Sequence, residues 1–365
     1  MTVDLRYSEV EEELRTAVRD LLVARSPASA VLARVETAEP HDPKLWRQLA
    51  GEMGLAGLAV PAGSGGAGAS WREVAVVLEE LGRAVAPVPY LGSAVVATRA
   101  LQACGQSGAH LLGRLASAAA TAAVVVPFGV APFGAAPGAP ATAVSADGEG
   151  LTGTVRGVAD ALTADVLLVA AGGSLWAVDG GDAGVRRTPV VSLDATRPLC
   201  DVTLTSASAV TVGDAEAVGA GLLAGAALLA AEQVGVAQWC LDTTVAYLKE
   251  RYQFARPVGS FQALKHRLAD VWVAVTQARA VARYAAGCLA DDDPDLPVAA
   301  ALAQAHCGPV AVLAAEECVQ LHGGIGFTWE HPAHLYLKRA RADAVAFGTA
   351  DAHRAALGGL VDLTL

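Results

Sequence analysis

The chain has 365 residues, of which 53% are hydrophobic, 17% charged and 5% aromatic, and its formal net charge is −11. This length suggests two or three packed units, and the apolar fraction excludes a disordered chain. The acidic balance, 37 Asp and Glu against 26 Lys and Arg, disfavours a nucleic-acid surface, because phosphate binding needs clustered positive charge. We therefore expect no nucleic-acid partner.

Membrane insertion is not expected either. The mean hydropathy is +0.41, yet the most apolar uninterrupted stretch, residues 218–231, has only 14 residues and is too short for a bilayer. The amino terminus mixes acidic and basic residues where a secretory signal has a basic start and an apolar run. We expect a cytoplasmic protein. Its six cysteines lie far apart without any CxxC pair, so we interpret them as buried small hydrophobes.

The first region, residues 1–118, has a helical pattern. Apolar residues recur at helical spacing from Val10 to Leu22, which predicts one buried stripe. A second helix is predicted to begin at Ser70, since Ser70 and Glu73 form a capping-box sequence ahead of another apolar stripe. We expect residues 1–118 to form an N-terminal helical domain.

The second region, residues 119–215, changes to short β-type runs. Strands are predicted at residues 122–126, 151–158, 166–169 and 175–178, separated by turns such as Asp147-Gly148 and Asp179-Gly180. Residues 128–140 hold three prolines and three glycines, which predicts a loop. We expect a small β domain.

The third region, residues 216–365, returns to long Ala- and Leu-rich segments. Four helices are predicted, joined by short connections that contain Pro or Gly, at residues 216–250, 260–289, 294–320 and 333–361. Four long helices with short connections make a bundle. The predicted fold is therefore mainly α with a central β domain.

Two passages in this last region have the residues of a nucleotide site. The first, residues 251–270, gathers Arg251, Phe254 and Gln262 around a Pro/Gly turn, where a guanidinium suits a phosphate and an aromatic ring suits a base. The second, residues 320–332, places Gly323 and Gly324 after a helical run, so that backbone amides can approach a ligand. Alone, a Gly-Gly is more often a helix cap and an arginine a solvated charge. Together they favour a nucleotide diphosphate.

These two passages resemble the acyl-CoA dehydrogenase family. Its C-terminal domain has the pattern R-x-x-F-G-x-P-I-G-x-F-Q-x-x-K-H-x-L-A-D, which this chain matches nearly intact with Ala255 in place of Gly, and the pattern Q-x-x-G-G-x-G-F. The order of helical domain, β domain and helical bundle is also similar, and residues 58–68 resemble the family's N-terminal P-x-x-x-G-G-x-G. The resemblance covers the whole chain and is weakest in the β domain.

The resemblance implies an N-terminal helical domain, a middle β-barrel and a C-terminal four-helix bundle. It implies a dimer or doubled dimer with FAD across the subunit interface. The residues that match the family's contacts to the adenosine-diphosphate half of FAD are Arg251, Phe254, Gln262, Gln320, Gly323 and Gly324. The implied reaction removes a proton α to an acyl-CoA thioester with a carboxylate and transfers hydride from the β carbon to the flavin.

The catalytic half of the family pattern is missing. The flavin-ring segment T-E-P-x-x-G-S-D is replaced by PFGVAPFG at residues 127–134, and Phe347 stands where the family's spacing places the catalytic Glu. Some members carry the base near the position of Gly225, where this helix is uncharged until Glu232. The helix also lacks the family's Asp-x-x-Arg contact to coenzyme A. Glu232 is a weak candidate base, because burial would raise its pKa, and the alternative is that it pairs with a neighbouring helix.

Other candidates are weaker still. His331 and His334 could share a metal, but no third ligand is evident and a solvated loop is the simpler interpretation. Asp343 and Asp351 border the expected active-site rim, and Asp351 could cap a helix after Thr349. We therefore predict no metal.

An intact nucleotide half beside a degraded catalytic half predicts a subunit that completes its partner's site. Our hypothesis is the non-catalytic subunit of a heteromeric α2β2 acyl-CoA dehydrogenase, similar to those of actinobacterial steroid side-chain degradation, with a paralogous subunit supplying the base. Two alternatives stay open. One is a homo-oligomeric dehydrogenase that uses Glu232, and the other is a redox-inactive binding or assembly protein on the same fold.

Overall fold

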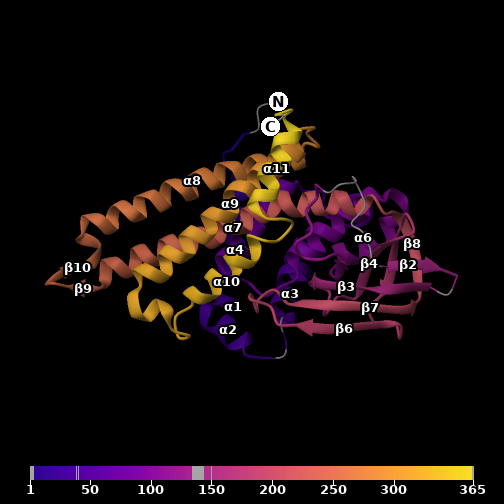
Figure 1. Ribbon diagram of the computed structural model, residues 1–365, viewed down its shortest axis with the longest axis horizontal. Coiled ribbons are helices and arrows are strands. Elements are labelled where there is room, and N and C mark those ends of the chain that lie inside the picture. Colours follow the sequence, from indigo (N-terminus) through magenta and orange to yellow (C-terminus); the bar gives the residue numbers. More distant parts are fainter. Residues whose placement is uncertain (1–3, 38, 40, 134–143, 149, 364–365) are drawn as a thin grey trace.

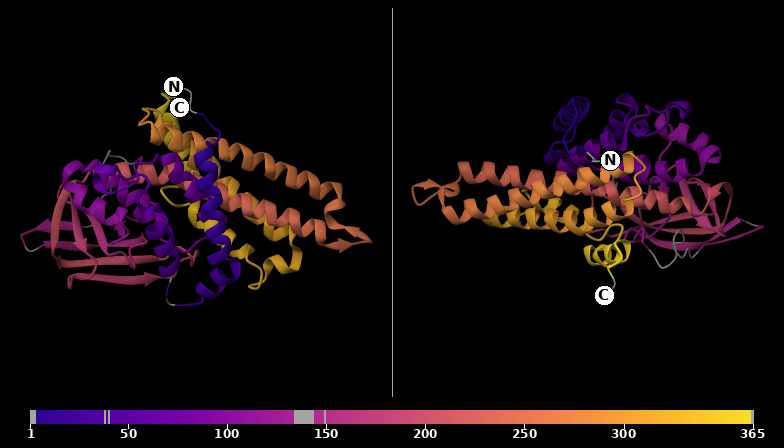
Figure 2. Two further views of the ribbon diagram at one scale, coloured as in Figure 1. Left: turned by 180° about the vertical axis from the view of Figure 1, so that it is seen from behind. Right: turned by 90° about the horizontal axis from the view of Figure 1, so that it is seen from above.

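The computed structural model describes residues 4–37, 39, 41–133, 144–148 and 150–363. An N-terminal group of helices and two β-sheets lie at one end of the molecule, and a long helical bundle extends away from them (Figures 1 and 2). The N-terminal helices are α1 (Glu9–Arg25), α2 (Ala28–Arg34), α3 (Pro43–Trp46), α4 (Trp71–Arg83), α5 (Thr98–Ala103) and α6 (Ala109–Ala116). Short 3-10 or π-helical segments join them at Arg47–Glu52, Leu55–Gly57, Ala62–Ser64, Tyr90–Ala97 and Gly105–Gly108.

The N-terminal caps agree with the sequence in part. Ser70 caps α4, because its hydroxyl oxygen accepts a hydrogen bond from the Arg72 amide at 3.1 Å. The reciprocal bond from Glu73 does not form among the described residues, and one of its carboxylate oxygens is buried without a partner. A complete capping box occurs instead at the start of α1, where Ser8 and Glu11 bond each other's backbone amides.

Two four-stranded sheets pack face to face in the middle region. The strands are β1 (Ala122–Val124), β2 (Val144–Asp147), β3 (Gly150–Ala159), β4 (Val166–Ala171), β5 (Ser174–Asp179), β6 (Val185–Val190), β7 (Leu199–Ala207) and β8 (Ala209–Asp214). One sheet has the order β1-β4-β5-β8, and the other β2-β3-β7-β6. Only the β1–β4 pair is parallel among the described strands. Alternating residues such as Val155, Leu167 and Val202 form a core shared by both sheets. Most of the loop predicted at residues 128–140 lies outside the described residues.

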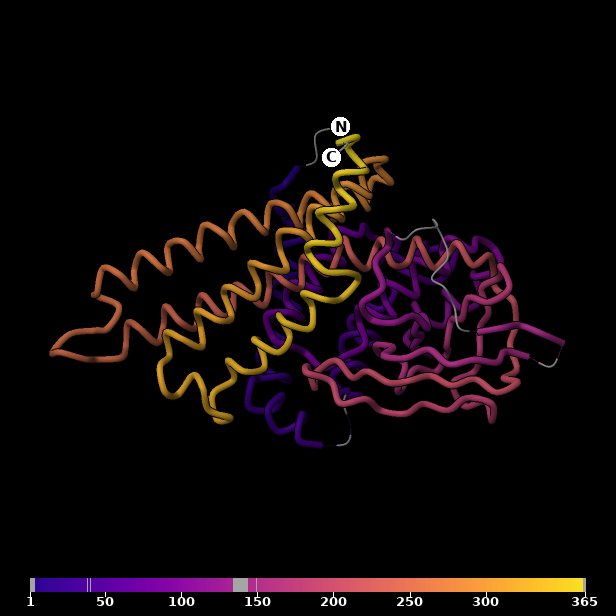
Figure 3. Tube along the Cα trace, in the orientation of Figure 1, coloured from indigo at the N-terminus to yellow at the C-terminus, as the bar shows by residue number. Residues whose placement is uncertain are grey.

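The bundle is built on three long helices. Its elements are α7 (Ala217–Glu250), β9 (Tyr252–Gln253), β10 (Arg256–Pro257), a 3-10 turn (Val258–Ser260), α8 (Gln262–Ala290), α9 (Leu296–Leu321), a second 3-10 turn (Gly323–Phe327), α10 (Ala333–Asp343) and α11 (Ala350–Leu360). The β9–β10 hairpin and the α9–α10 connection lie at the same far end of the bundle (Figures 1 and 3).

The prediction of a single fourth helix at residues 333–361 is wrong. It divides into α10 and α11, because Phe347 and Gly348 take φ values of +52° and +104°, which no α-helix contains. Thr349 then caps α11 by accepting from the Ala352 amide, so Thr349 and not Asp351 is the N-cap. The break directs the Phe347 side chain into the interior, where it is only 6% exposed.

Helix α7 is the central element of the molecule. It crosses α4 so closely that a Cβ on Gly235 would lie 1.9 Å from the Glu79 carbonyl oxygen, which explains why glycine stands there. By length and composition, α7 and α9 are each apolar enough to cross a membrane, contrary to the estimate from the uninterrupted run of 14 residues. Their most apolar windows are 83% and 67% buried inside the protein, as in core helices of a folded domain.

The cysteines largely follow the prediction. Five of the six are buried and none of the six forms a disulfide, while Cys104 is partly exposed and donates to the Ala100 carbonyl oxygen. Their environments are therefore mainly those of small apolar side chains.

Candidate functional site

The first predicted nucleotide passage lies on the surface at the far end of the bundle. Arg251 ends α7, Phe254 lies in the β9–β10 hairpin and Gln262 begins α8. All three are exposed, and Phe254 is 86% exposed with its backbone at φ +53°. The hairpin is closed by the Val258 amide, which donates to the Arg251 carbonyl at 2.7 Å. A large aromatic ring is thus held in solvent by a defined turn.

The second passage lies beside the first. Gln320 is near the end of α9, and Gly323 and Gly324 follow it in a 3-10 turn. The ring of Tyr247, one turn before Arg251, stacks on His322 with centroids 4.5 Å apart, which joins the two passages. The structure therefore brings the six predicted residues to one end of the bundle, where all six are exposed.

The two glycines differ in backbone conformation. Gly323 has φ +63°, a conformation that glycine adopts without strain at a helix end. Gly324 has no such conformation, and a Cβ at either position would meet nothing within 4 Å. Nothing in the described part of this chain therefore requires glycine at 324. A glycine at 324 is consistent with a ligand or another chain that approaches the backbone closely there.

A pair of thiols lies beneath this turn. Cys318 Sγ is 3.6 Å from His322 Nδ1, which also lies 2.7 Å from the Cys318 carbonyl oxygen. A hydrogen bond from the Cys240 thiol, opposed by burial, lowers the pKa of Cys318 to about 5. Burial lowers the pKa of His322, but its bonds to Cys318 outweigh burial and raise it. These contacts fix the imidazole of His322, the residue directly before Gly323.

The positions expected for the flavin ring and the base meet at the other end of α7, and this place is filled. The cavity that Phe128 and Phe347 line there has a volume of about 40 Å³. Their rings are 6.4 Å apart, and the Phe347 amide donates to the Phe128 carbonyl at 3.0 Å. A Cβ on Gly225 would lie 2.7 Å from the Phe347 ring. The two alternative base positions, 225 and 347, therefore face each other without a carboxylate.

Glu232 does not have the geometry of a free base. Both its carboxylate oxygens accept from Arg197 Nη2, at 2.7 and 2.8 Å, and one also accepts from Arg339 Nη1. The glutamate is 2% exposed. Two guanidinium groups donate to its carboxylate and occupy both oxygens, so the geometry favours the structural alternative, pairing with neighbouring elements.

Two further carboxylates complete this buried cluster. Asp343 accepts from Arg197 Nη1 at 2.5 Å, and Asp194 accepts from Arg339 Nε. Burial and the neighbouring Glu232 charge raise the pKa of Asp343 to about 8. Arg339 and Arg197 hold the pKa of Asp194 below its usual value in spite of burial. The cluster joins the segment before β7 to α7 and α10. The sequence analysis did not predict its members Arg197, Arg339 and Asp194.

One carboxylate does line the central cavity. Asp160 is 4% exposed, accepts from the Gly92 amide at 3.2 Å, and has its other oxygen 3.3 Å from His41 Nε2. It lies at φ +59°, directly after β3. The sequence does contain a signal for Asp160, because this residue lies just after a predicted strand, but the site prediction did not include it.

The remaining candidates have local partners. His331 Nδ1 accepts from the Ala333 amide at 3.2 Å, and the His334 ring contacts Trp329. Asp351 is exposed and pairs with Arg354 on the same helix. The described residues contain no group of three side chains suited to a metal ion.

Comparisons with known proteins give consistent matches over the chain. A family model for the acyl-CoA dehydrogenase N-terminal domain matches residues 8–117, and one for the acyl-CoA dehydrogenase C-terminal domain matches residues 215–359. The chain is 38% identical to the acyl-CoA dehydrogenase IpdE2 of Mycolicibacterium smegmatis over 344 residues, which is 93% of this chain and 95% of that protein.

Two solved structures, each named after a pair of proteins, are also similar to this chain. A variant of the Tcur3481-Tcur3483 steroid ACAD has a TM-score of 0.85 and 33% identity, covering 97% of this chain and 98% of that chain. The ChsE4-ChsE5 complex from Mycobacterium tuberculosis has a TM-score of 0.87 and 27% identity, covering 99% of this chain and 100% of that chain. The fold and the order of its three regions are thus those of these proteins.

Proposed function

Because this chain belongs to the acyl-CoA dehydrogenase family, we propose that it is the non-catalytic subunit of a heteromeric, FAD-dependent acyl-CoA dehydrogenase. In this proposal a paralogous subunit supplies the catalytic base and the contacts to the flavin ring. This chain supplies contacts to the adenosine-diphosphate half of the FAD. The assembly would be an α2β2 heterotetramer.

The observation that carries the proposal is the filled centre of this chain. A cavity of about 40 Å³ holds little more than a water molecule, whereas a ligand site measures about 300–1,000 Å³. Phe128 and Phe347 occupy the space where the ring and base are expected, and Glu232 is bound by two arginines. At this place the described residues therefore leave room for neither the isoalloxazine ring nor a thioester beside a free carboxylate.

The far end of the bundle supports the other half of the proposal. Arg251 can pair with the pyrophosphate, Phe254 offers a ring to the adenine, and Gln262 and Gln320 offer amides to the ribose and phosphates. Gly323 and Gly324 expose backbone amides to which an anion can approach. These groups lie on an open surface, so a second subunit must cover the cofactor.

The chemistry divides accordingly between the subunits. When bound, FAD accepts hydride from the β carbon of the acyl thioester. The residues of this chain bind and orient the nucleotide tail, and they exchange no proton with the substrate. The partner's carboxylate would remove the α proton. Since one of the similar structures is called a steroid ACAD, we include a steroid side-chain acyl-CoA as the substrate class.

A pair of variants tests the cofactor assignment. Arg251→Ala should lower the FAD content of the purified complex, because the loss of a charge-assisted contact costs about 1.5–3 kcal/mol. Gly324→Ala should also lower it, since the added methyl would occupy the approach of the cofactor. Neither change should lower the melting temperature of the chain, because Arg251 is exposed and a Cβ at position 324 meets nothing within 4 Å.

The matched control is Arg341→Ala, which removes a half-exposed arginine on α10 whose partner among the described residues is Glu316. This control should retain the FAD content of the unaltered complex. Full flavin occupancy in both the Arg251 and Gly324 variants would overturn the assignment of this surface. A colourless complex of normal stability with the unaltered chain would favour the redox-inactive alternative.

A further inference from the structure

A second cavity lies far from the nucleotide surface, between the N-terminal helices and the β-sheets. Its volume is about 570 Å³, within the range of small-molecule sites. Helix α3 and the segment that precedes it contribute to the lining from one side of the sequence, and the chain after β3 together with β6 contributes from the β region. The apolar lining consists of Pro43, Trp46, Pro89, Leu162 and Pro189.

Two polar side chains, His41 and Thr163, lie on one side of this cavity. His41 Nδ1 lies 3.0 Å from Thr163 Oγ1, within hydrogen-bonding distance. His41 Nε2 lies 3.3 Å from the Asp160 carboxylate but makes no hydrogen bond to the described residues. The Thr163 oxygen has lone pairs and can accept a hydrogen bond from a ligand.

A further polar side chain at this cavity is Asp165, two residues after Thr163. The Thr121 hydroxyl donates to Asp165 Oδ2 at 2.9 Å, and the Thr121 amide donates to the same oxygen at 2.7 Å. The Asp165 carboxylate can accept further bonds, since each carboxylate has about four acceptor positions. Glu39 adds a second carboxylate at the rim, 3.9 Å from Arg34. Among the described residues that line the cavity there is no lysine or arginine.

We propose that this cavity binds a small organic cation, an amine carried on an aromatic or alicyclic ring. The hydrogen-bond acceptors Thr163 and Asp165 match an ammonium group, which has three donors and no acceptor. The ring of Trp46 and the prolines match an apolar ring, and the indole face also attracts a cation. Anionic acyl-CoA and nucleotides are unsuited to an acidic lining, so this site is distinct from the proposed FAD surface.

Three ligands with one ring and different charges test the proposal directly. Titration calorimetry on the full-length chain would compare 1-naphthylmethylamine, 1-naphthylmethanol and 1-naphthoate. We expect the amine to bind at least tenfold more tightly than the alcohol, and the carboxylate not to bind. The preference for the amine should decrease with added salt, because it rests on charge. Equal binding of all three ligands would overturn the proposal.

Variants then locate the binding. Asp165→Asn keeps an acceptor for Thr121 and should reduce the affinity for the amine about tenfold, toward that of the alcohol. Leu162→Arg places a cation in the cavity and should abolish amine binding. The control Trp272→Ala removes an exposed ring of α8 and should change nothing. If correctly folded Leu162→Arg protein binds the amine as tightly as the unaltered chain, the amine binds elsewhere and the proposal fails.

Discussion

Glu232 is held by two buried guanidinium groups, and substitution separates its possible roles. Glu232→Ala should destabilise the fold by about 3–5 kcal/mol, because Arg197 and Arg339 lose a buried partner. Glu232→Gln, which keeps the shape and one acceptor, should cost less but remain measurably destabilised in chemical denaturation. The activity of a complex should decrease only as far as its stability does.

A base at Glu232 would give the reverse result. Glu232→Gln would then abolish turnover while the denaturation midpoint stayed at its unaltered value. That outcome would favour the homo-oligomeric alternative.

Asp343 makes the same cluster sensitive to pH. Its pKa in the folded protein is about 8, raised by burial and by the Glu232 charge, whereas in the unfolded chain the carboxyl titrates near 3.8. Between these values the folded state holds a proton that the unfolded state has lost. This group therefore destabilises the fold progressively as pH rises from about 4 to 8, by up to about 1.4 kcal/mol per pH unit.

Asp343→Asn removes this titration and retains an acceptor for Arg197. Unfolding free energies of the two proteins, measured at pH 5 and pH 8, should show a steeper loss with pH in the unaltered chain. Parallel pH profiles would contradict the assignment of a protonated Asp343.

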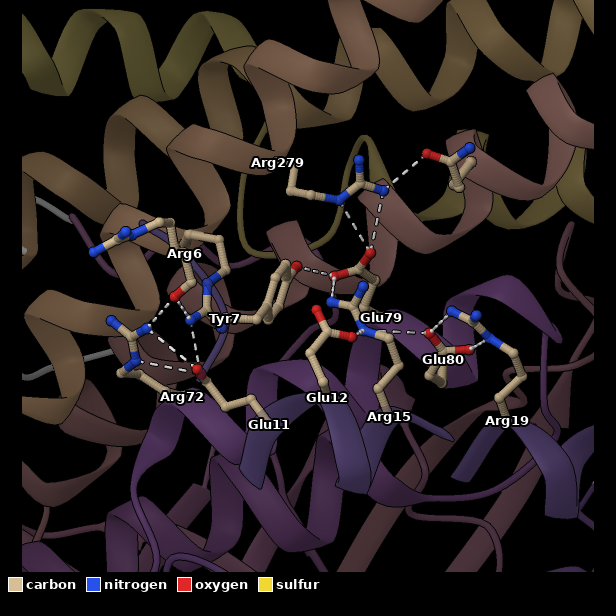
Figure 4. Close-up of polar contacts among 12 residues, drawn as sticks. Arg6, Tyr7, Glu11, Glu12, Arg15, Arg19, Arg72, Glu79, Glu80 and Arg279 are labelled. Carbon is tan, nitrogen blue, oxygen red and sulfur yellow. Dashed lines mark hydrogen bonds and ion pairs between the residues drawn. The ribbon is translucent and has the colours of Figure 1, made fainter. Parts of the chain in front are cut away.

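At the scale of elements, ion pairs join α1, α4 and α8 (Figure 4). Glu79 on α4 accepts from Tyr7 at 2.5 Å and from Arg279 of α8 at 3.2 Å, and Glu80 pairs with Arg19 of α1. Arg72 donates to the Glu11 carboxylate and to the carbonyls of Asp4 and Arg6. The chain before α1 is therefore attached to the helices by several contacts: the Arg72 guanidinium, the Tyr7 hydroxyl, and Arg283, which also donates to the Arg6 carbonyl at 3.1 Å.

Arg72→Ala should weaken this attachment, because Asp4 loses its contact to Arg72 and Arg6 keeps only its contact to Arg283. Hydrogen exchange of a peptide containing residues 4–8 should become faster, and the fold should lose about 1–3 kcal/mol, because the buried Glu11 carboxylate loses one partner and keeps Arg283. Arg341→Ala is again the matched control, since exposed pairs contribute about 0–1 kcal/mol. Equal exchange in both variants would show that Arg72 does not hold the segment.

Hydrophobic periodicity predicted most elements because it reports which face of a helix or strand is buried. It placed strands at 151–158 and 166–169 and helices at 216–250 and 294–320, close to β3, β4, α7 and α9. It failed between α10 and α11, where Ala344, Val345, Ala346 and Phe347 continue an apolar pattern while the backbone turns. The break directs the Phe347 ring inward without interrupting the run of apolar residues, so hydrophobic periodicity gives no sign of it.

The site could be predicted from the sequence only where motifs are local. Residues 251–262 and 320–324 are short passages, and the structure brings them to one end of the bundle. The resemblance gave 347 and 225 as two alternative base positions, and the structure places them side by side, since a Cβ on Gly225 would lie 2.7 Å from the Phe347 ring. The buried ion cluster has no local pattern, because its pairs join residues 35, 107 and 145 positions apart.

At the scale of the whole molecule, we propose one surface for the nucleotide and a catalytic centre on another chain. The exposed apolar side chains at the bundle end agree with this division, since Phe254, Phe327 and Trp329 are 86%, 89% and 74% exposed. Exposed aromatic groups of this kind mark a surface that another molecule covers. The chain should accordingly be incomplete as a flavoenzyme by itself.

The most direct measurement is the visible flavin absorbance of the chain purified alone and purified with its most similar paralogue, followed by dye-coupled oxidation of acyl-CoA thioesters. We predict a colourless, inactive single chain and a yellow, active complex. A yellow and active preparation of the single chain would contradict the account.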